Sequence, residues 1–181
     1  MRFPSTWILN FLCFFLLFNL ACSFQTTFWY QVFGQVPSPF LWILFPIFFI
    51  VTRPGFGALF IGYFFTFVAS RYSSIHLGNL LVVMSLITFL ILMLRSRIYW
   101  SGPSYYILIS FGSLLTFHLL LLVISFVLED NPAPLLIGDR FIQIVLTLGF
   151  CYPTYLLMQK IDNLFTTNES FIQGFGEPRD L

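Results

Sequence analysis

His118 is the residue best placed to do chemistry within this chain, because it is a histidine deep inside a long apolar stretch. With about 3.6 residues per turn, a helix there would carry Ser110, His118, Ser125 and Glu129 on one face about 100° wide. A buried polar face of this kind can mark a path for protons or for a substrate. It can equally join helices through hydrogen bonds worth roughly 1 kcal/mol each, without any further function. We favour the packing role for His118.

A second polar face is expected on the last apolar stretch, which carries Asp139, Gln143, Thr147 and Thr154. Asp139 and Arg140 begin that stretch, where water can reach them, so their charges need no catalytic role. The sequence contains no Ser–His–Asp arrangement, HExxH, phosphate-binding loop or GxSxG motif. Scattered carboxylates and one buried histidine do not assemble a metal site. The sequence therefore predicts no enzyme activity, no cofactor and no metal.

The composition places these residues in a membrane. Of 181 residues, 59% are hydrophobic and only 8% are charged, whereas soluble domains carry about 25% charged residues. Such a chain cannot coat a water-facing surface, so we predict an integral membrane protein whose surroundings are lipid. The net charge of +1 argues against a nucleic-acid partner. The 26 phenylalanines suggest no function by themselves.

The apolar runs predict an all-α protein with one transmembrane domain over residues 1–165 and a short polar cytoplasmic tail at 166–181. We expect the first run to be a retained helix, not a cleaved signal peptide. Residues 23–38 mix polar side chains with Trp29 and Tyr30, which predicts a loop at the membrane surface. Pro46 should kink the second span. The six expected spans are 5–24, 39–52, 56–70, 77–94, 105–128 and 137–158.

The distribution of arginine and lysine predicts the orientation, since cytoplasmic loops carry an excess of both. With six spans, Arg71 and Arg140 fall on one side of the membrane. The other side holds the larger group, and is therefore expected to be cytoplasmic together with both termini; this group comprises Arg2, Arg53, Arg95, Arg97, Lys160 and Arg179.

Small side chains recur on the third predicted span, at Ala58, Gly62, Thr66 and Ser70. Every fourth residue of a helix falls on nearly one face, so another helix could approach this one closely there. We expect this helix to organise the bundle. Its small face would pack a neighbouring helix, either from the bundle itself or from a partner.

Residues 39–165 resemble the MreD family of bacterial rod shape-determining proteins at three places. The first is the glycine-bearing helix from Gly57 to Gly62, followed by a polar segment and Leu77-Gly78; Thr66 stands where the family commonly has aspartate. The second is the fourth span, which ends at Leu94-Arg95 before an aromatic turn and a long fifth span. The third is residues 144–162, with a late proline, Pro153, and a basic residue, Lys160, just beyond the span.

This resemblance implies a non-enzymatic protein of the bacterial inner membrane that supports lateral peptidoglycan synthesis and cell shape. It implies four partners: an MreC-type periplasmic scaffold, an MreB-type actin homologue, a wall glycosyltransferase and a transpeptidase. It also implies a six-helix architecture similar to the substrate-binding subunits of energy-coupling-factor transporters. By that analogy, a cavity between the helices would receive a partner's transmembrane helix.

Two other classes of function stay open. A substrate-binding subunit of a vitamin-type transporter has the same size and span count, and Arg71, Asp139 and Arg140 could line its polar pocket on the outer side. A membrane-embedded enzyme would use His118 and Glu129, although the sequence indicates no substrate for it. We rank both below the scaffold.

Overall fold

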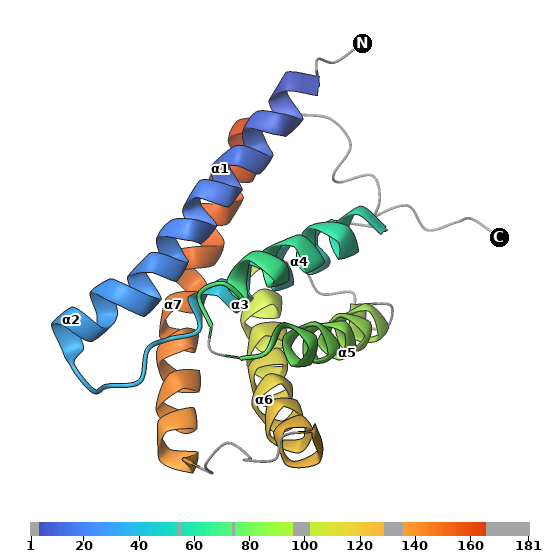
Figure 1. Ribbon diagram of the computed structural model, residues 1–181. Coiled ribbons are helices and arrows are strands. Elements are labelled where there is room, and N and C mark those ends of the chain that lie inside the picture. Colours follow the sequence, from blue (N-terminus) through green and yellow to red (C-terminus); the bar gives the residue numbers. More distant parts are fainter. Residues whose placement is uncertain (1–3, 54–55, 74, 96–101, 129–135, 166–181) are drawn as a thin grey trace.

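The computed structural model describes residues 4–53, 56–73, 75–95, 102–128 and 136–165, and every regular element in these ranges is a helix (Figure 1). The side chains of residues 4–7, 56 and 58 lie outside the description, as do Glu129 and the predicted tail at 166–181. The elements are α1 (Pro4–Ser23), the π-helix η1 (Phe24–Phe28), α2 (Trp29–Phe33), α3 (Leu41–Thr52), α4 (Phe56–Ala69), α5 (Leu77–Arg95), α6 (Pro103–Leu128) and α7 (Ile137–Phe165).

This is an all-α membrane protein. Among the described residues, four apolar helical segments are long enough to cross a bilayer: Ile8–Phe33, Leu77–Arg95, Pro103–Val127 and Ile137–Phe165. Two further apolar helices are shorter. With a rise of 1.5 Å per residue, the 12 residues of α3 and the 14 of α4 are about 18 and 21 Å long, against about 30 Å for the hydrocarbon core of a bilayer.

The surface loop expected over residues 23–38 is wrong for most of its length, because α1 continues through η1 and α2 as far as Phe33. Some of the polar side chains in this segment have partners inside the protein, so these do not need water. The Thr26 hydroxyl donates to the Cys22 carbonyl at 2.9 Å, and the indole N–H of the buried Trp29 donates to the Val36 carbonyl at 3.0 Å. The helix ends at Gly34, whose φ of +62° is a conformation that glycine adopts at no steric cost.

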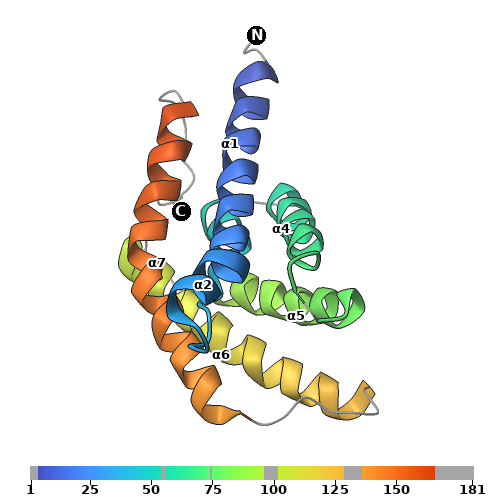
Figure 2. The same ribbon diagram turned by 60° about the vertical axis from the view of Figure 1, so that its left-hand side comes forward.

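The helix at the centre of the fold is α3, not the small-residue helix α4 that we expected to organise the bundle. All ten residues from Leu41 to Ile50 are buried, and α3 packs against α1, α4, α5, α6 and α7. Figures 1 and 2 show α1 and α7 side by side along one flank, and α4 packs against α3. A helix that is apolar all round belongs inside protein, and its shortness is no difficulty there.

Partners from other helices hold both ends of α3. At its amino end the Leu41 N–H donates to Gln25 Oε1 at 3.1 Å, and the Phe40 N–H donates to Thr147 Oγ1 at 2.9 Å. These two acceptors satisfy backbone donors that have no partner within the helix. In its middle, near Pro46, the Tyr106 hydroxyl donates to the Leu44 carbonyl at 2.8 Å.

At the carboxyl end of α3 the chain forms a polar cluster. The Arg53 guanidinium pairs with the Asp162 carboxylate at 2.8 Å, and the Asn10 amide donates to the same oxygen at 3.0 Å. Arg95 donates to the carbonyls of Ile50 and Arg53, at 3.1 and 2.8 Å. Helices α1, α3, α5 and α7 are therefore tied together at this end.

Several of the phenylalanines, which suggested no function in the sequence, lie in the core. Phe14 and Phe18 of α1 meet Phe49 of α3 and Phe65 of α4, with ring centroids 4.8 Å apart for Phe14–Phe49 and 4.7 Å for Phe18–Phe65. Lipid tails are as apolar as side chains, so burial from water does not join helices within a bilayer. Close contacts between aromatic rings supply part of the attraction that does.

Candidate binding cavity

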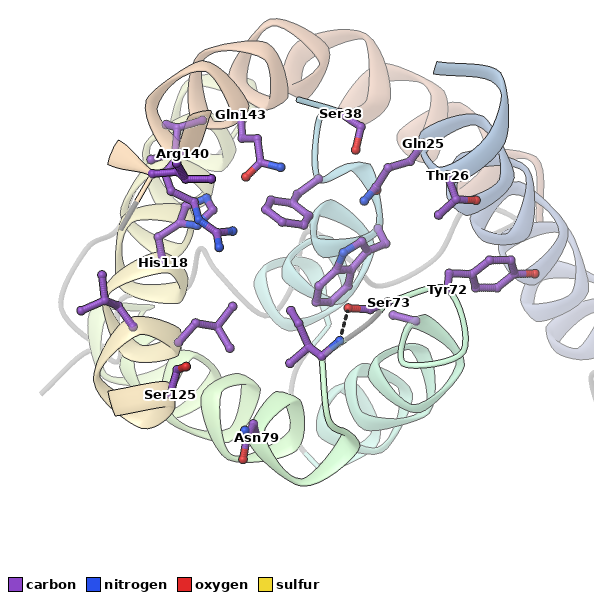
Figure 3. Close-up of a pocket in the computed structure, with 18 of the residues that line it drawn as sticks. Gln25, Thr26, Ser38, Tyr72, Ser73, Asn79, His118, Ser125, Arg140 and Gln143 are labelled. Atoms are coloured by element: carbon purple, nitrogen blue, oxygen red, sulfur yellow. Dashed lines mark hydrogen bonds between the residues drawn. The ribbon is translucent and has the colours of Figure 1, made fainter. Parts of the chain in front are cut away.

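A cavity of about 1160 Å³ lies at the amino end of α3, opposite the Arg53–Asp162 end. Figure 3 shows helices surrounding it and polar side chains pointing inward. Its wall is formed by η1, the start of α3, the turn after α4, the first turn of α5, the carboxyl half of α6 and the amino half of α7. Ten polar side chains are labelled there: Gln25, Thr26, Ser38, Tyr72, Ser73, Asn79, His118, Ser125, Arg140 and Gln143.

The π-helix η1 and the start of α3 form two adjacent parts of the cavity wall. The wider turns of η1 interrupt the α-helix where Gln25 and Thr26 face the cavity, and such π segments often occur at functional sites. Gln25 then caps α3, so the start of that helix, with Phe40 and Trp42, forms part of the cavity wall. Sequence reasoning missed this side of the site because it assigned residues 23–38 to a surface loop. The polar residues within the apolar run were the available signal.

His118 lies on the cavity wall, as a polar face on the fifth span suggested. Its ring packs against Phe40, with centroids 5.4 Å apart, and against Phe117 at 5.8 Å. Neither ring nitrogen has a hydrogen-bond partner among the described residues, although both are shielded from solvent. Leaving such a group unpaired costs roughly 1–3 kcal/mol. We favoured an interhelical hydrogen bond for His118, and this prediction is wrong as far as the described residues go, because none of them bonds to its ring.

Two neighbours of His118 on α7 complete a polar corner. Arg140 and Gln143 are one turn apart and both line the cavity, and Figure 3 shows Arg140 lying against His118 with Gln143 beside them. Gln143 Oε1 is buried and has no hydrogen-bond partner within the described ranges. Among the lining residues that the structure describes, Arg140 is the one arginine or lysine, and none is aspartate or glutamate. The cavity is thus electropositive at this corner.

The two predicted polar faces are only partly brought together. On α6, Ser125 joins His118 at the cavity, whereas Ser110 is fully buried away from it and Glu129 lies outside the described residues. The other three predicted residues of the α7 face do not line this cavity. Asp139 is exposed, Thr147 caps α3, and Thr154 lines a separate cavity of about 680 Å³.

Two residues of the small face of α4, Gly62 and Thr66, are buried inside the bundle. A Cβ atom added at Gly62 would lie 3.7 Å from Ile50 Cδ1 and 3.9 Å from Pro46 Cβ, both on α3. Thr66 is fully buried and its hydroxyl donates to the Gly62 carbonyl at 2.8 Å. Ser70 lies in the turn after α4 and bonds within its own chain segment, to the Phe67 carbonyl. The Ala58 side chain lies outside the described residues.

The outer pocket considered for a vitamin-type subunit was expected to use three charged residues. Arg140 does line the cavity, but Arg71 and Asp139 do not. The Arg71 guanidinium lies over the Phe67 ring instead, 5.5 Å from its centroid. In the described ranges, no three side chains of the His, Cys, Asp and Glu types come together as a metal site.

Comparisons with known proteins assign neither a family nor a function, because no protein-family model, curated protein or solved structure matches this chain. The function is therefore argued from the cavity, from the distribution of charge, and from the resemblance seen in the sequence.

Proposed function

We propose that this protein is a non-enzymatic inner-membrane component of the bacterial elongation machinery, and that its cavity receives a segment of an MreC-type scaffold. The cavity between η1, α3, α6 and α7 is the observation that supports a binding role most directly. In this proposal α3 and α4 are the second and third of six membrane spans. Being buried by its neighbours, α3 does not need to match the thickness of the bilayer.

The charges support an orientation in which the cavity opens toward the periplasm. Arg53 and Arg95 gather at the carboxyl end of α3, and Lys160 lies two residues before Asp162 on the same end of α7. The cavity lies at the other end of α3, about 18 Å away. If basic residues mark the cytoplasmic side, both termini are cytoplasmic and the cavity faces the compartment of the proposed scaffold.

The cavity rim supplies apolar surface for such a partner. Leu119 on α6 and Phe141 on α7 line the cavity and are also 65% and 66% exposed. An apolar segment of a partner could cover both while its polar groups meet Arg140 and Gln143. With the scaffold bound there, the protein would connect it to the wall glycosyltransferase and transpeptidase, and at its opposite, cytoplasmic end to the MreB-type actin homologue.

The proposal is tested by affinity purification of the tagged protein in mild detergent, with mass spectrometry of all retained proteins. We expect an MreC-type scaffold and wall synthases. Leu119→Trp should lower their recovery, because Leu119 is on the cavity rim; Leu86→Trp is the matched control, since Leu86 is also exposed on a long helix but does not line the cavity. Recovery of none of these partners from the unaltered protein would refute the scaffold function.

A substrate-binding subunit of a vitamin-type transporter is the second candidate, and the charged corner of the cavity favours it. Arg140, His118 and Gln143 offer the few convergent polar groups that orient a small ligand. In the same purification, this function requires paired ATPases and a coupling membrane subunit in place of the wall synthases, together with a small molecule that co-purifies.

A further inference from the structure

We propose that Arg140, His118 and Gln143 form a subsite for one anionic group, a carboxylate or a phosphate, carried on an apolar body. This inference concerns the same cavity as the proposed function and names the ligand chemistry of its charged corner, but it does not depend on the identity of the partner proteins. The three side chains project from α6 and α7 into the same corner of the cavity (Figure 3).

Arg140 carries the argument for an anion. Its guanidinium is charged at any physiological pH, and it is half-buried in the wall of a cavity within a membrane protein. Charged side chains in such places are nearly always paired or used for a ligand. Within the described residues, the Arg140 guanidinium has no ion-pair or hydrogen-bond partner, in contrast to that of Arg53, which pairs with Asp162, and that of Arg95, which donates to two carbonyls.

His118 and Gln143 supply further hydrogen-bond donors beside the Arg140 charge. An imidazole has one N–H donor when neutral and two when charged, an amide has two, and a guanidinium has five in a planar fork. Both ring nitrogens of His118 and the Gln143 carbonyl oxygen have no partner among the residues described, so turning toward a ligand would break no hydrogen bond at those atoms. An anion with two or more oxygens can accept from all three side chains at once.

The remaining wall selects an apolar body for the ligand. Beyond the charged corner, the lining includes Phe40, Trp42, Leu115, Leu122 and Ile144. Small-molecule sites commonly have volumes of about 300–1000 Å³, so a cavity of about 1160 Å³ accommodates more than a free inorganic anion. The ligand class is therefore an amphiphile with an anionic head, either a soluble small molecule or a membrane lipid.

The test uses the purified full-length protein in a neutral detergent and four probes: hexanoate, hexyl phosphate, hexanol and inorganic phosphate. Isothermal titration should show binding of hexanoate and hexyl phosphate, with hexanol and inorganic phosphate at least about 10-fold weaker. Arg140→Gln should weaken binding of the two anionic probes by about 10- to 100-fold, the usual range for losing a hydrogen bond to a charged group. Arg71→Gln is the matched control, because Arg71 does not line the cavity.

A second variant and a second measurement keep the result decisive. If Arg140→Gln does not fold, Arg140→Lys should fold and retain anion binding within about 10-fold, because the positive charge remains. Native mass spectrometry then separates the two ligand sources: Arg140-dependent retention of phosphatidylglycerol over phosphatidylcholine identifies a lipid headgroup, and hexyl-anion binding without that preference identifies a soluble amphiphile. Hexanol binding as tightly as hexanoate, or equal anion affinity in the Arg140 and Arg71 variants, would overturn the proposal whatever the purification shows about partners.

Discussion

Gly62→Leu tests whether the small face of α4 serves the bundle or a partner. In the structure Gly62 is buried against α3, and an added Cβ would be in ordinary van der Waals contact with Ile50 and Pro46, at 3.7 and 3.9 Å. Alanine therefore fits without rearrangement. Leucine adds three carbon atoms beyond Cβ, and these must enter space that the two α3 side chains already occupy.

The expected loss of stability follows from that overlap. Overpacking a well-filled core costs typically about 1–3 kcal/mol. For a chain of 181 residues, each kcal/mol corresponds to roughly 2–4 °C in the midpoint of thermal unfolding. Gly62→Leu should thus lower the midpoint of the purified protein in detergent by about 2–12 °C, whereas Gly62→Ala should leave it unchanged or raise it slightly because alanine favours the helix.

Gly112 on α6 provides a matched control for this substitution. Thr116 donates to the Gly112 carbonyl at 2.8 Å, just as Thr66 donates to the Gly62 carbonyl at 2.8 Å, but a Cβ at Gly112 would meet nothing within 4 Å. Gly112→Leu should therefore be tolerated. An unchanged unfolding midpoint for Gly62→Leu, combined with loss of partner recovery, would refute packing against α3 and assign the small face to a partner.

Three further substitutions test the contacts that hold the central helix. Gln25→Leu should destabilise the protein by about 1 kcal/mol, because the Leu41 N–H loses its side-chain acceptor and keeps only the Pro39 carbonyl at 3.0 Å; thermal unfolding of the purified variant measures this, and no change would show that α3 does not need the cap. Tyr106→Phe should lower stability by about 1 kcal/mol through loss of the hydroxyl bonded to the Leu44 carbonyl, so a Phe variant as stable as the parent would contradict that bond. Asp162→Asn removes the carboxylate of the ion pair at the other end of α3, whose side chains are 19% and 16% exposed. We expect a loss of about 1–3 kcal/mol, between the values for exposed and buried pairs, and a double-mutant cycle with the paired arginine should show coupling of similar size.

The ends of several helices could be predicted from the sequence, because charged and helix-breaking residues mark them. The run from Leu77 to Leu94 ends at Arg95, where α5 ends, and Gly102-Pro103 precedes the next run, where α6 begins. The same reasoning failed at residues 23–38. Polar side chains there were taken as evidence for water, whereas a hydrogen bond within the protein satisfies them equally well.

The burial of α3 could not be predicted, and the reason is physical. Hydropathy reports whether a side chain avoids water, but in a membrane an apolar side chain can face lipid or protein at similar free energy. The run from Leu41 to Ile50 is as apolar as a lipid-facing span, yet all of it is buried in protein. Its shortness was the available signal, since about 18 Å of helix is less than the roughly 30 Å of hydrocarbon that a lipid-facing span must cross.

The polar residues of the cavity show why residue type alone does not identify a site. Gln25 and Thr147 each accept a hydrogen bond from the start of α3, so their polar atoms already serve the fold. His118 and Gln143 are as polar and lie near the same end of that helix, yet His118 Nδ1 and Nε2 and Gln143 Oε1 have no partner among the described residues. Asn10 Oδ1, Tyr105 Oη and Ser110 Oγ are also buried without a partner among the described residues, but they do not line the cavity. The support for the proposed ligand is therefore the position of His118 and Gln143 beside Arg140 at one cavity corner, which exists only when helices distant in sequence are brought together.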